Sequence, residues 1–145
     1  MRALAALATL AVLASCTPHH CKLIDGAAQG DLAHEVQVQS EASALDGRRV
    51  LVYVGAVWCE PCQRFHEAAH KGELDGVLGN VDLLVYDLDR DGARLQGAGF
   101  GSQMIPLLVV PDGTGRGTAK RMQGSIKGPG AVAEMTPRLQ ALLAP

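Results

Sequence analysis

Two cysteines separated by two residues stand where the chain is predicted to pass from a strand into a helix. The segment reads Trp58-Cys59-Glu60-Pro61-Cys62. A thiol at a helix N-terminus faces unpaired backbone N–H groups and the positive end of the helix dipole, so we expect Cys59 to have a lowered pKa and to react as a thiolate. Cys62 lies one helical turn further on, where its thiol can attack a mixed disulfide formed on Cys59. Pro61 suits the first turn because its missing N–H has no helical partner there. The spacing therefore predicts thiol–disulfide exchange at this pair.

Metal binding and a purely structural disulfide are the alternative roles for this cysteine pair. A zinc ribbon needs a second Cys pair of this kind, and the four cysteines of the chain include none. His66 and His70 follow Cys62 at four and eight residues, but helical geometry turns both away from the apolar stripe and toward solvent. We therefore expect no metal at this position. A copper or zinc site formed by Cys59, Cys62 and His66 stays open as the alternative, as does electrostatic tuning of the motif by His66.

Alternating strands and helices must position this pair. Residues 50–54 are a continuous apolar run rich in Val, as expected of a strand buried on both faces. Helical periodicity follows over residues 62–78, whereas residues 32–45 fit either a strand or a short helix. The further elements predicted are a strand at 81–88, a short helix within 90–100, a strand at 107–110, an edge strand at 118–123 and a helix at 131–143. This order predicts an α/β fold with a mixed central sheet of four to five strands and helices on both faces.

The cysteine motif resembles the active-site motif of the thioredoxin family, and two further features resemble that family in the right order. Met104-Ile105-Pro106 precedes the strand predicted at 107–110, where thioredoxins carry an Ile-Pro with a cis peptide bond facing the cysteines. Gly124, between the edge strand and the last helix, also fits the family pattern. The resemblance covers residues 50–143 and implies a thioredoxin fold.

The resemblance also implies roles for individual residues. It implies that Cys59 is the nucleophile, that Cys62 is the resolving thiol and that Pro106 lines the substrate groove. The supporting residues that it implies are Trp58, Glu60, Pro61 and Ile105. Activity of this kind uses protein thiols and disulfides as substrates, needs an upstream electron donor and requires no cofactor.

Three positions depart from the family pattern. Tyr53 stands where thioredoxins commonly carry a buried Asp, five residues before Trp58, and Val85 aligns with a Lys usually found near it. The proton-relay pair that assists Cys62 is therefore expected to be absent. Glu60 replaces the common Gly between the cysteines, and a carboxylate beside a thiolate opposes its ionisation. A less stabilised thiolate makes the oxidised form more favourable, so we expect the protein to work as a reductant.

Residues 1–15 are predicted to be an export signal. Arg2 is followed by an apolar run over residues 3–13, too short for a bilayer span of roughly 20 apolar residues. The signal ends in Leu-Ala-Ser before Cys16, which resembles the bacterial lipobox and implies cleavage before Cys16 and lipid attachment to its sulfur. Thr17 is not the Asp that commonly signals inner-membrane retention, so the resemblance implies an anchor on the periplasmic face of the outer membrane. A plain secretory signal with a chance Cys is the alternative.

A flexible tether is predicted over residues 16–31, after the lipidated Cys16, because the segment that follows is polar, small and aperiodic. A thioredoxin-like domain would then occupy residues 32–145. The run His19-His20-Cys21 fits either a metal-binding tract or a solvated linker with an unpaired thiol, and we expect the linker. An unpaired Cys21 could join two copies of the chain.

Composition and charge exclude other classes of function. The chain has 145 residues, enough for one domain, and a formal net charge of −2 without a basic block, so nucleic acid is not expected as a partner. The acids from Asp87 onward begin like a calcium loop, but Ala98 stands where that loop requires Glu, and a helix cap explains them better. Residues 97–101 do not match a dinucleotide-binding fingerprint.

Together these patterns predict an envelope thiol–disulfide oxidoreductase that exchanges a Cys59–Cys62 disulfide with protein substrates. Its expected partners are protein thiols and disulfides, an electron donor, and a membrane reached through the anchor on Cys16. The alternatives are a copper or zinc chaperone and a thioredoxin-fold adaptor whose cysteines only brace a loop.

Overall fold

The structure, a computed structural model, describes residues 19–145 of the chain. The strands are β1 Lys22–Asp25, β2 Arg49–Gly55, β3 Val81–Asp87, β4 Leu107–Pro111 and β5 Gly117–Gln123. The helices are α1 Leu32–Leu45, α2 Glu60–His70, α3 Asp75–Leu78, α4 Leu88–Gly97 and α5 Ala131–Leu143. Within this part of the chain, no helix is long and apolar enough to cross a membrane. The predicted signal over 1–15 and the predicted lipidation residue Cys16 lie outside the described residues.

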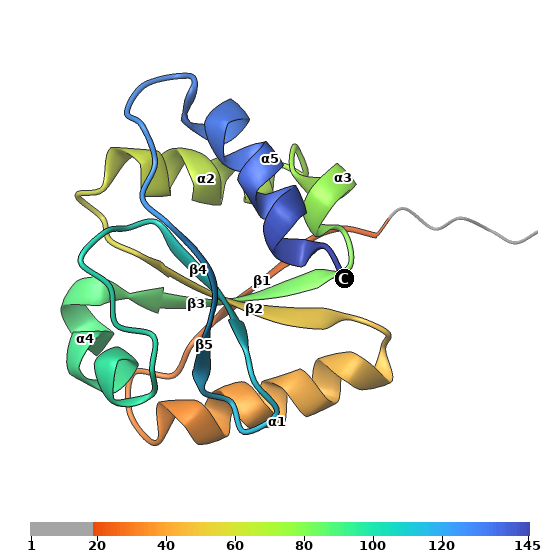
Figure 1. Cartoon of the computed structure of the whole chain (residues 1–145), viewed down its shortest axis with the longest axis vertical. Coiled ribbons are helices and arrows are strands. Elements are labelled where there is room, and N and C mark those ends of the chain that lie inside the picture. Colours follow the sequence, from red (N-terminus) through yellow and green to blue (C-terminus); the bar gives the residue numbers. More distant parts are fainter. Residues whose placement is uncertain (1–18) are drawn as a thin grey trace, which may run out of the picture.

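The strands form one mixed sheet in the order β1-β3-β2-β4-β5. β1, β3 and β2 run parallel, whereas β4 is antiparallel to β2 and β5 is antiparallel to β4. Parallel neighbours need a crossover connection that packs back onto the sheet. Helices therefore cover both faces, with α2, α3 and α5 on one side and α1 and α4 on the other (Figure 1). This confirms the predicted α/β architecture.

Each face of the sheet carries its own hydrophobic core. Successive side chains of a strand point to opposite faces, so Leu51 and Tyr53 join the core under α2, α3 and α5, together with Phe65. Val52 and Val54 join the core under α1 and α4. Because both faces are buried, β2 is apolar along nearly its whole length, and this is the pattern that identified it in the sequence.

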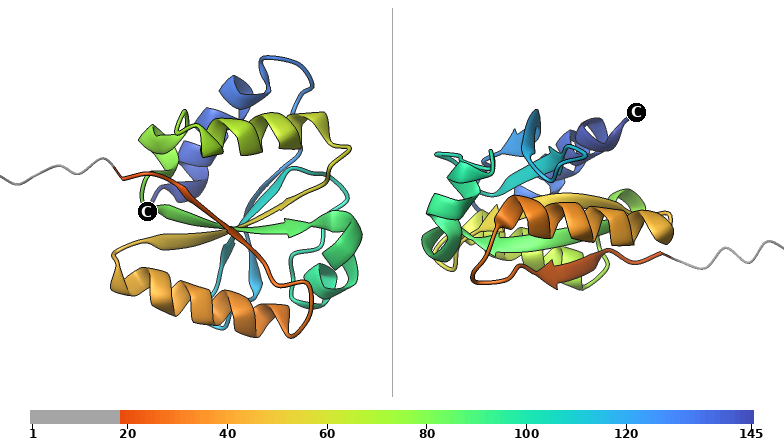
Figure 2. Two further views of the ribbon diagram at one scale, coloured as in Figure 1. Left: turned by 180° about the vertical axis from the view of Figure 1, so that it is seen from behind. Right: turned by 90° about the horizontal axis from the view of Figure 1, so that it is seen from below.

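The prediction of a flexible tether over residues 16–31 is wrong for part of the described segment. Lys22–Asp25 forms β1, which pairs with β3 at the edge of the sheet. Figure 2 brings this strand to the front of the molecule in the view from behind. Its four residues are too few to show a hydrophobic period, so pairing with a strand far along the chain decides its structure. The folded domain therefore begins well before residue 32.

Residues just before β1 are also fixed to the domain. Asp75 in α3 holds them, because its Oδ2 lies 2.5 Å from His20 Nδ1 and its Oδ1 accepts the Cys21 N–H at 2.9 Å. The Cys21 side chain is only 8% exposed and belongs to the core under α2, α3 and α5. The predicted solvated linker is therefore wrong at this position, whereas the Cys21 thiol is unpaired within residues 19–145, as predicted.

Two helices differ from their predicted bounds. Residues 32–45, which fitted a strand or a helix, form α1, and Asp31 caps it by accepting the His34 N–H at 3.1 Å. The helix predicted over 62–78 instead begins at Glu60 and ends at His70. Gly72, just beyond that end, has φ of +78°, a conformation that favours glycine and terminates a helix. α3 follows as a separate short helix.

A buried ion pair joins the α1–β2 turn to the start of β3. The side chains of Arg48 and Asp82 are 6% and 4% exposed, and Arg48 Nε lies 2.5 Å from Asp82 Oδ1. The other Asp82 oxygen accepts the Ser43 hydroxyl at 2.6 Å. Arg48 also donates to three backbone carbonyls, including that of His20 at 2.9 Å. The guanidinium therefore satisfies its hydrogen bonds internally and holds residue 20 to the sheet.

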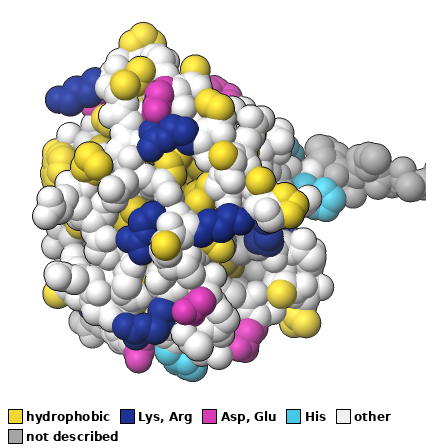
Figure 3. Space-filling view, viewed as in Figure 1, with side chains coloured by type: hydrophobic (Ala, Val, Ile, Leu, Met, Phe, Trp, Pro, Cys, Tyr) yellow, Lys and Arg dark blue, Asp and Glu magenta, His cyan; other side chains and the backbone are white. Residues whose placement is uncertain are grey.

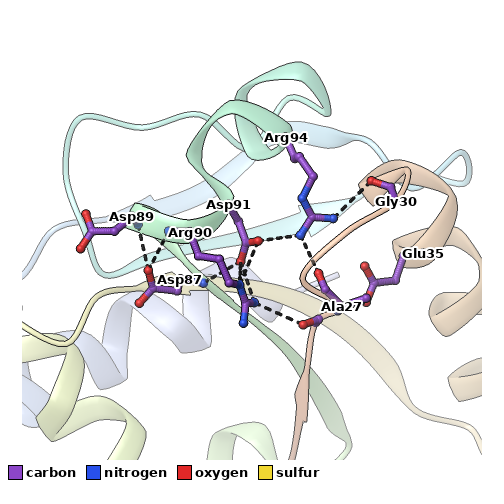
Figure 4. A network of polar contacts seen from close by, with 9 residues as sticks. Ala27, Gly30, Glu35, Asp87, Asp89, Arg90, Asp91 and Arg94 are labelled. Carbon is purple, nitrogen blue, oxygen red and sulfur yellow. Dashed lines mark hydrogen bonds and ion pairs between the residues drawn. The ribbon is translucent and has the colours of Figure 1, made fainter.

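The acidic segment at the start of α4 is a helix cap, as predicted. The Asp87 carboxylate accepts the N–H groups of Asp89 and Arg90 at 2.9 and 3.0 Å. Asp91 is fully buried and pairs with Arg90 at 2.7 Å and with Arg94 at 2.6 Å (Figure 4). Arg94 also donates to backbone carbonyls of the β1–α1 connection. The network thus ties α4 to the segment that follows β1.

Candidate active site

Cys59 and Cys62 form a disulfide at the junction of β2 and α2. Their Cα atoms are 5.2 Å apart and the S–S distance is 2.10 Å. Cys59 is the N-cap of α2, and its Sγ lies 3.3 Å from the backbone N of Cys62. In the reduced state this N–H and the helix dipole would favour a thiolate on Cys59. The structure therefore brings the two predicted thiols together in the arrangement that exchange requires.

A groove of about 370 Å³ opens at Cys59. The cysteine motif forms one part of it, and the loops at residues 103–105 and 124–127 form the rest. Trp58, 63% exposed, is held by a hydrogen bond from its Nε1 to Asp89 Oδ2 at 2.8 Å. Cys59 lines the groove although it is only 5% exposed, whereas Cys62 is 2% exposed and does not line it. Of the two sulfurs, Cys59 is therefore the one nearer to an incoming substrate.

The Ile105–Pro106 peptide bond is cis, as the family resemblance implied. Ile105 lines the groove and packs against the cluster that contains both cysteines. Pro106, which the resemblance placed in the groove, is buried and does not line it. Its carbonyl accepts the Gly124 N–H at 2.9 Å. Gly124 has φ of +69°, which a side chain would disfavour. The two loops that border the groove are thus joined by a backbone hydrogen bond.

Glu60 connects the cysteine motif to the loop before α5. Its carboxylate bonds to the Arg64 guanidinium and accepts the Gly128 N–H at 3.0 Å. These contacts, above all the one with Arg64, lower the pKa of Glu60. Because Arg64 offsets the negative charge, Glu60 opposes ionisation of Cys59 less than an unpaired carboxylate would. The contact with Gly128 joins positions 68 residues apart, so no local sequence pattern predicts it.

Tyr53 contacts the turn that carries Cys62, a role that sequence reasoning missed. Its hydroxyl donates to the Cys62 carbonyl at 3.1 Å, and its ring packs on Phe65 with 5.0 Å between centroids. Gly55 leaves room for the hydroxyl, since a Cβ there would lie 2.5 Å from it. Burial raises the pKa of Tyr53 above its usual range, so the hydroxyl donates a hydrogen bond and does not accept a proton. The available signal was that Tyr53 and Gly55 share one face of the strand.

A second cleft, of about 360 Å³, lies at the carboxyl ends of the parallel strands, with α2 beside it. Asp25, Val85 and Tyr53 are register partners across β1, β3 and β2 and line this cleft together with His66. His66 and His70 are exposed, as predicted. Among residues 19–145, no group of three or more His, Cys, Asp or Glu side chains is placed to hold a metal ion.

The solved structures that are similar to this chain include two thioredoxins. The structure of Trichomonas vaginalis thioredoxin matches with a TM-score of 0.53 and 20% identity, covering 83% of this chain and 96% of that chain. A mutant thioredoxin from Halobacterium salinarum matches with a TM-score of 0.45 and 18% identity, covering 90% of this chain and 99% of that chain. No protein-family model and no curated protein matches the sequence. The first similarity shows that the chain has the thioredoxin fold, which confirms the predicted fold class.

Proposed function

We propose that this thioredoxin-fold protein is a thiol–disulfide oxidoreductase that exchanges its Cys59–Cys62 disulfide with protein substrates. The observation that carries the proposal is the position of Cys59. It lines an open groove, and its sulfur faces the N–H of Cys62 at the start of α2. A disulfide that only braced a loop would need neither access from a groove nor a helix terminus to stabilise a thiolate.

The proposed reaction has two exchange steps. The Cys59 thiolate of the reduced protein attacks a substrate disulfide, so that a Cys59–substrate bond forms, the substrate S–S bond breaks and one substrate thiolate leaves. Cys62 then loses its proton to solvent and attacks the Cys59 sulfur, which releases the second substrate thiolate and closes the Cys59–Cys62 bond. The substrate gains two electrons and the protein loses two. A dithiol electron donor must return them before the next turnover.

Direction and location are parts of the same proposal. Glu60 places a carboxylate next to Cys59, and although Arg64 offsets its charge, it adds no stabilisation to the thiolate. We therefore assign the protein to the reducing direction. The apolar run before Cys16 supports an envelope protein anchored by a lipid on that residue. Thr17 after it favours the periplasmic face of the outer membrane.

Trapping the mixed disulfide tests the exchange mechanism. The full chain is prepared with Cys16→Ser and Cys21→Ala, so that only the motif cysteines remain. It is then reduced and mixed with insulin as a model disulfide substrate. Protein with both motif cysteines should reduce insulin. Cys62→Ala should lose turnover and accumulate a covalent insulin adduct, which mass spectrometry should map to Cys59. Cys59→Ala is the matched control and should form no adduct, because Cys62 does not line the groove.

Two outcomes would contradict the proposed exchange. One is a folded, reduced protein that leaves insulin intact. The other is an adduct that forms equally in Cys59→Ala, because the nucleophile would then not be the residue that lines the groove.

A further inference from the structure

We infer that the membrane faces the end of the domain where the parallel strands begin, and that the disulfide is held on the opposite end, pointing away from the bilayer. The inference rests on the lipid anchor at Cys16 in the proposed function. Its other premises are the direction of the sheet and the residue at which the chain becomes fixed to the domain.

The parallel strands give the domain two different ends. β1, β2 and β3 begin at what we call the amino end and finish at the carboxyl end. Cys59 follows the last residue of β2, Gly55, by four positions, so the disulfide lies at the carboxyl end. β2 has seven residues, which separates the two ends by about 20 Å. Figure 1 shows the segment that leads into β1 on the side of α3 and the C-terminus, and the β2–α2 connection on the opposite side.

The chain is fixed to the amino end from residue 20 onward. His20 contacts the Asp75 carboxylate through its side chain, and its carbonyl accepts from Arg48 at 2.9 Å. The next residue, Cys21, donates its N–H to Asp75 at 2.9 Å. Arg48 lies in the α1–β2 turn and Asp75 lies in α3. Three contacts to two separate parts of the domain therefore hold this segment. The free length of the tether is therefore set by the residues before His20.

That length is too short to let the domain rotate until its carboxyl end faces the bilayer. His20 comes four residues after Cys16, a distance of at most about 14 Å even for a fully extended chain. The strand direction alone puts about 20 Å between the amino end and the carboxyl end. An anchor attached at the amino end cannot pass around the domain to bring the carboxyl end against the bilayer. Cys59 is thus held off the membrane surface.

The side chains at the amino end suit lipid headgroups. Arg49 donates to the Leu143 carbonyl at 3.0 Å, and Lys120 donates to the Ala144 carbonyl at 2.7 Å. Both cations therefore lie beside the C-terminal end of α5. On the face drawn in Figure 3, Lys and Arg side chains form a band across the middle of the view, with acidic side chains above and below it. Leu45, where α1 leads into β2, is 89% exposed. Arg49 and Lys120 can contact lipid phosphate groups, and Leu45 can contact the interface of a bilayer. Exposed Asp46 and Glu73 also lie at this end, so the tether, and not a net positive charge, sets the orientation.

The orientation limits which substrates the disulfide can meet. A groove that opens at the carboxyl end faces the aqueous compartment, so it fits disulfides in water-soluble domains. Cysteines at or within the bilayer that carries the anchor lie beyond its reach.

Fluorescence transfer from tryptophan to the bilayer tests this orientation. Trp58 is the single tryptophan of the chain and stands beside Cys59. The lipidated protein, which would begin at Cys16, is reconstituted into vesicles of phosphatidylethanolamine and phosphatidylglycerol that carry dansyl-labelled phosphatidylethanolamine. The comparison protein is Trp58→Phe with Asn80→Trp, because Asn80 is exposed and directly precedes β3 at the amino end. Transfer from the tryptophan at position 80 should be at least about threefold more efficient, given a separation of about 20 Å between the ends.

The outcomes distinguish failure of the proposed orientation from failure of the proposed exchange activity. Equal transfer from both positions, or stronger transfer from Trp58, would overturn the orientation. Failure of the protein to float with vesicles would overturn the anchor and the orientation with it, and would leave the exchange chemistry to the insulin experiment. The expected transfer in a protein that cannot reduce insulin would support the orientation and contradict the activity.

Discussion

Replacing Tyr53 by Phe removes one hydroxyl next to Cys62 and leaves the ring in place. Tyr53 is 3% exposed and packs on Phe65, so a Phe ring fills the same space. The interaction lost is the 3.1 Å hydrogen bond to the Cys62 carbonyl. A buried hydrogen bond contributes about 1 kcal/mol net to stability. We therefore expect the free energy of unfolding to fall by about 1 kcal/mol, which corresponds to about 4 °C in Tm for a domain of this size.

The same loss is expected in the oxidised and the reduced protein. The hydroxyl donates to a backbone carbonyl rather than to sulfur, and burial holds the pKa of Tyr53 above its usual range. Tyr53 therefore takes no proton from Cys62 at any pH at which the protein works. The reduction potential depends on the difference in stability between the two redox states, so it should stay unchanged. A difference of about 1 kcal/mol between the states would appear as about 20 mV.

The assay combines urea unfolding of both redox states with equilibration of the protein in glutathione buffers. Tyr86→Phe is the control for the potential, because it removes a buried tyrosine hydroxyl that has no hydrogen-bond partner among residues 19–145 and lies in the core on the other face of the sheet. A potential that moves by about 20 mV or more in Tyr53→Phe, and not in the control, would refute the reasoning and make this hydroxyl part of the thiol chemistry. Unfolding at the same urea concentration as the parent protein would refute the predicted magnitude.

Two further predictions concern residues away from the groove. Asp82→Asn leaves the Arg48 guanidinium buried without its counter-charge, so the free energy of unfolding should fall by about 3–5 kcal/mol in a urea titration; a loss well below about 1 kcal/mol would contradict the buried pair. Burial, reinforced by Asp75, raises the pKa of the Cys21 thiol to about 12, so above about pH 9 the unfolded chain releases a proton that the folded protein keeps. Stability should then fall as pH rises from about 9 toward 12, and Cys21→Ala should make this fall shallower by about 1.4 kcal/mol per pH unit; an identical slope in the variant would show that Cys21 does not contribute.

Local patterns predicted much of the fold. The apolar run of β2, the helical period after Cys62 and the acidic cap at Asp87 each depend on residues a few positions apart, and all three are present. β1 was missed because four residues carry too little period to distinguish a strand from a linker. Its strand structure is decided by hydrogen bonds to β3, which begins about 60 residues later.

The candidate site divides in the same way. The pairing of Cys59 with Cys62 is a local matter, because three residues of helix bring the two sulfurs within bonding distance. Glu60 could be identified as an unusual residue in the motif, but its contact with Gly128 could not. Tyr53 departs from the family pattern, which the sequence shows. Only the packing of β2 against α2 shows that its hydroxyl donates a hydrogen bond to the Cys62 carbonyl.

The order of residues by itself determined where the redox pair lies and which strand and helix hold it, because turn chemistry and hydrophobic period act over one or two turns of chain. Only the tertiary structure decided which of the two sulfurs faces a groove, what holds the charge of Glu60, and at which end of the domain His20 joins it. Those properties depend on contacts between segments distant in the sequence, and such contacts exist only once the sheet has fixed the direction and neighbours of each strand.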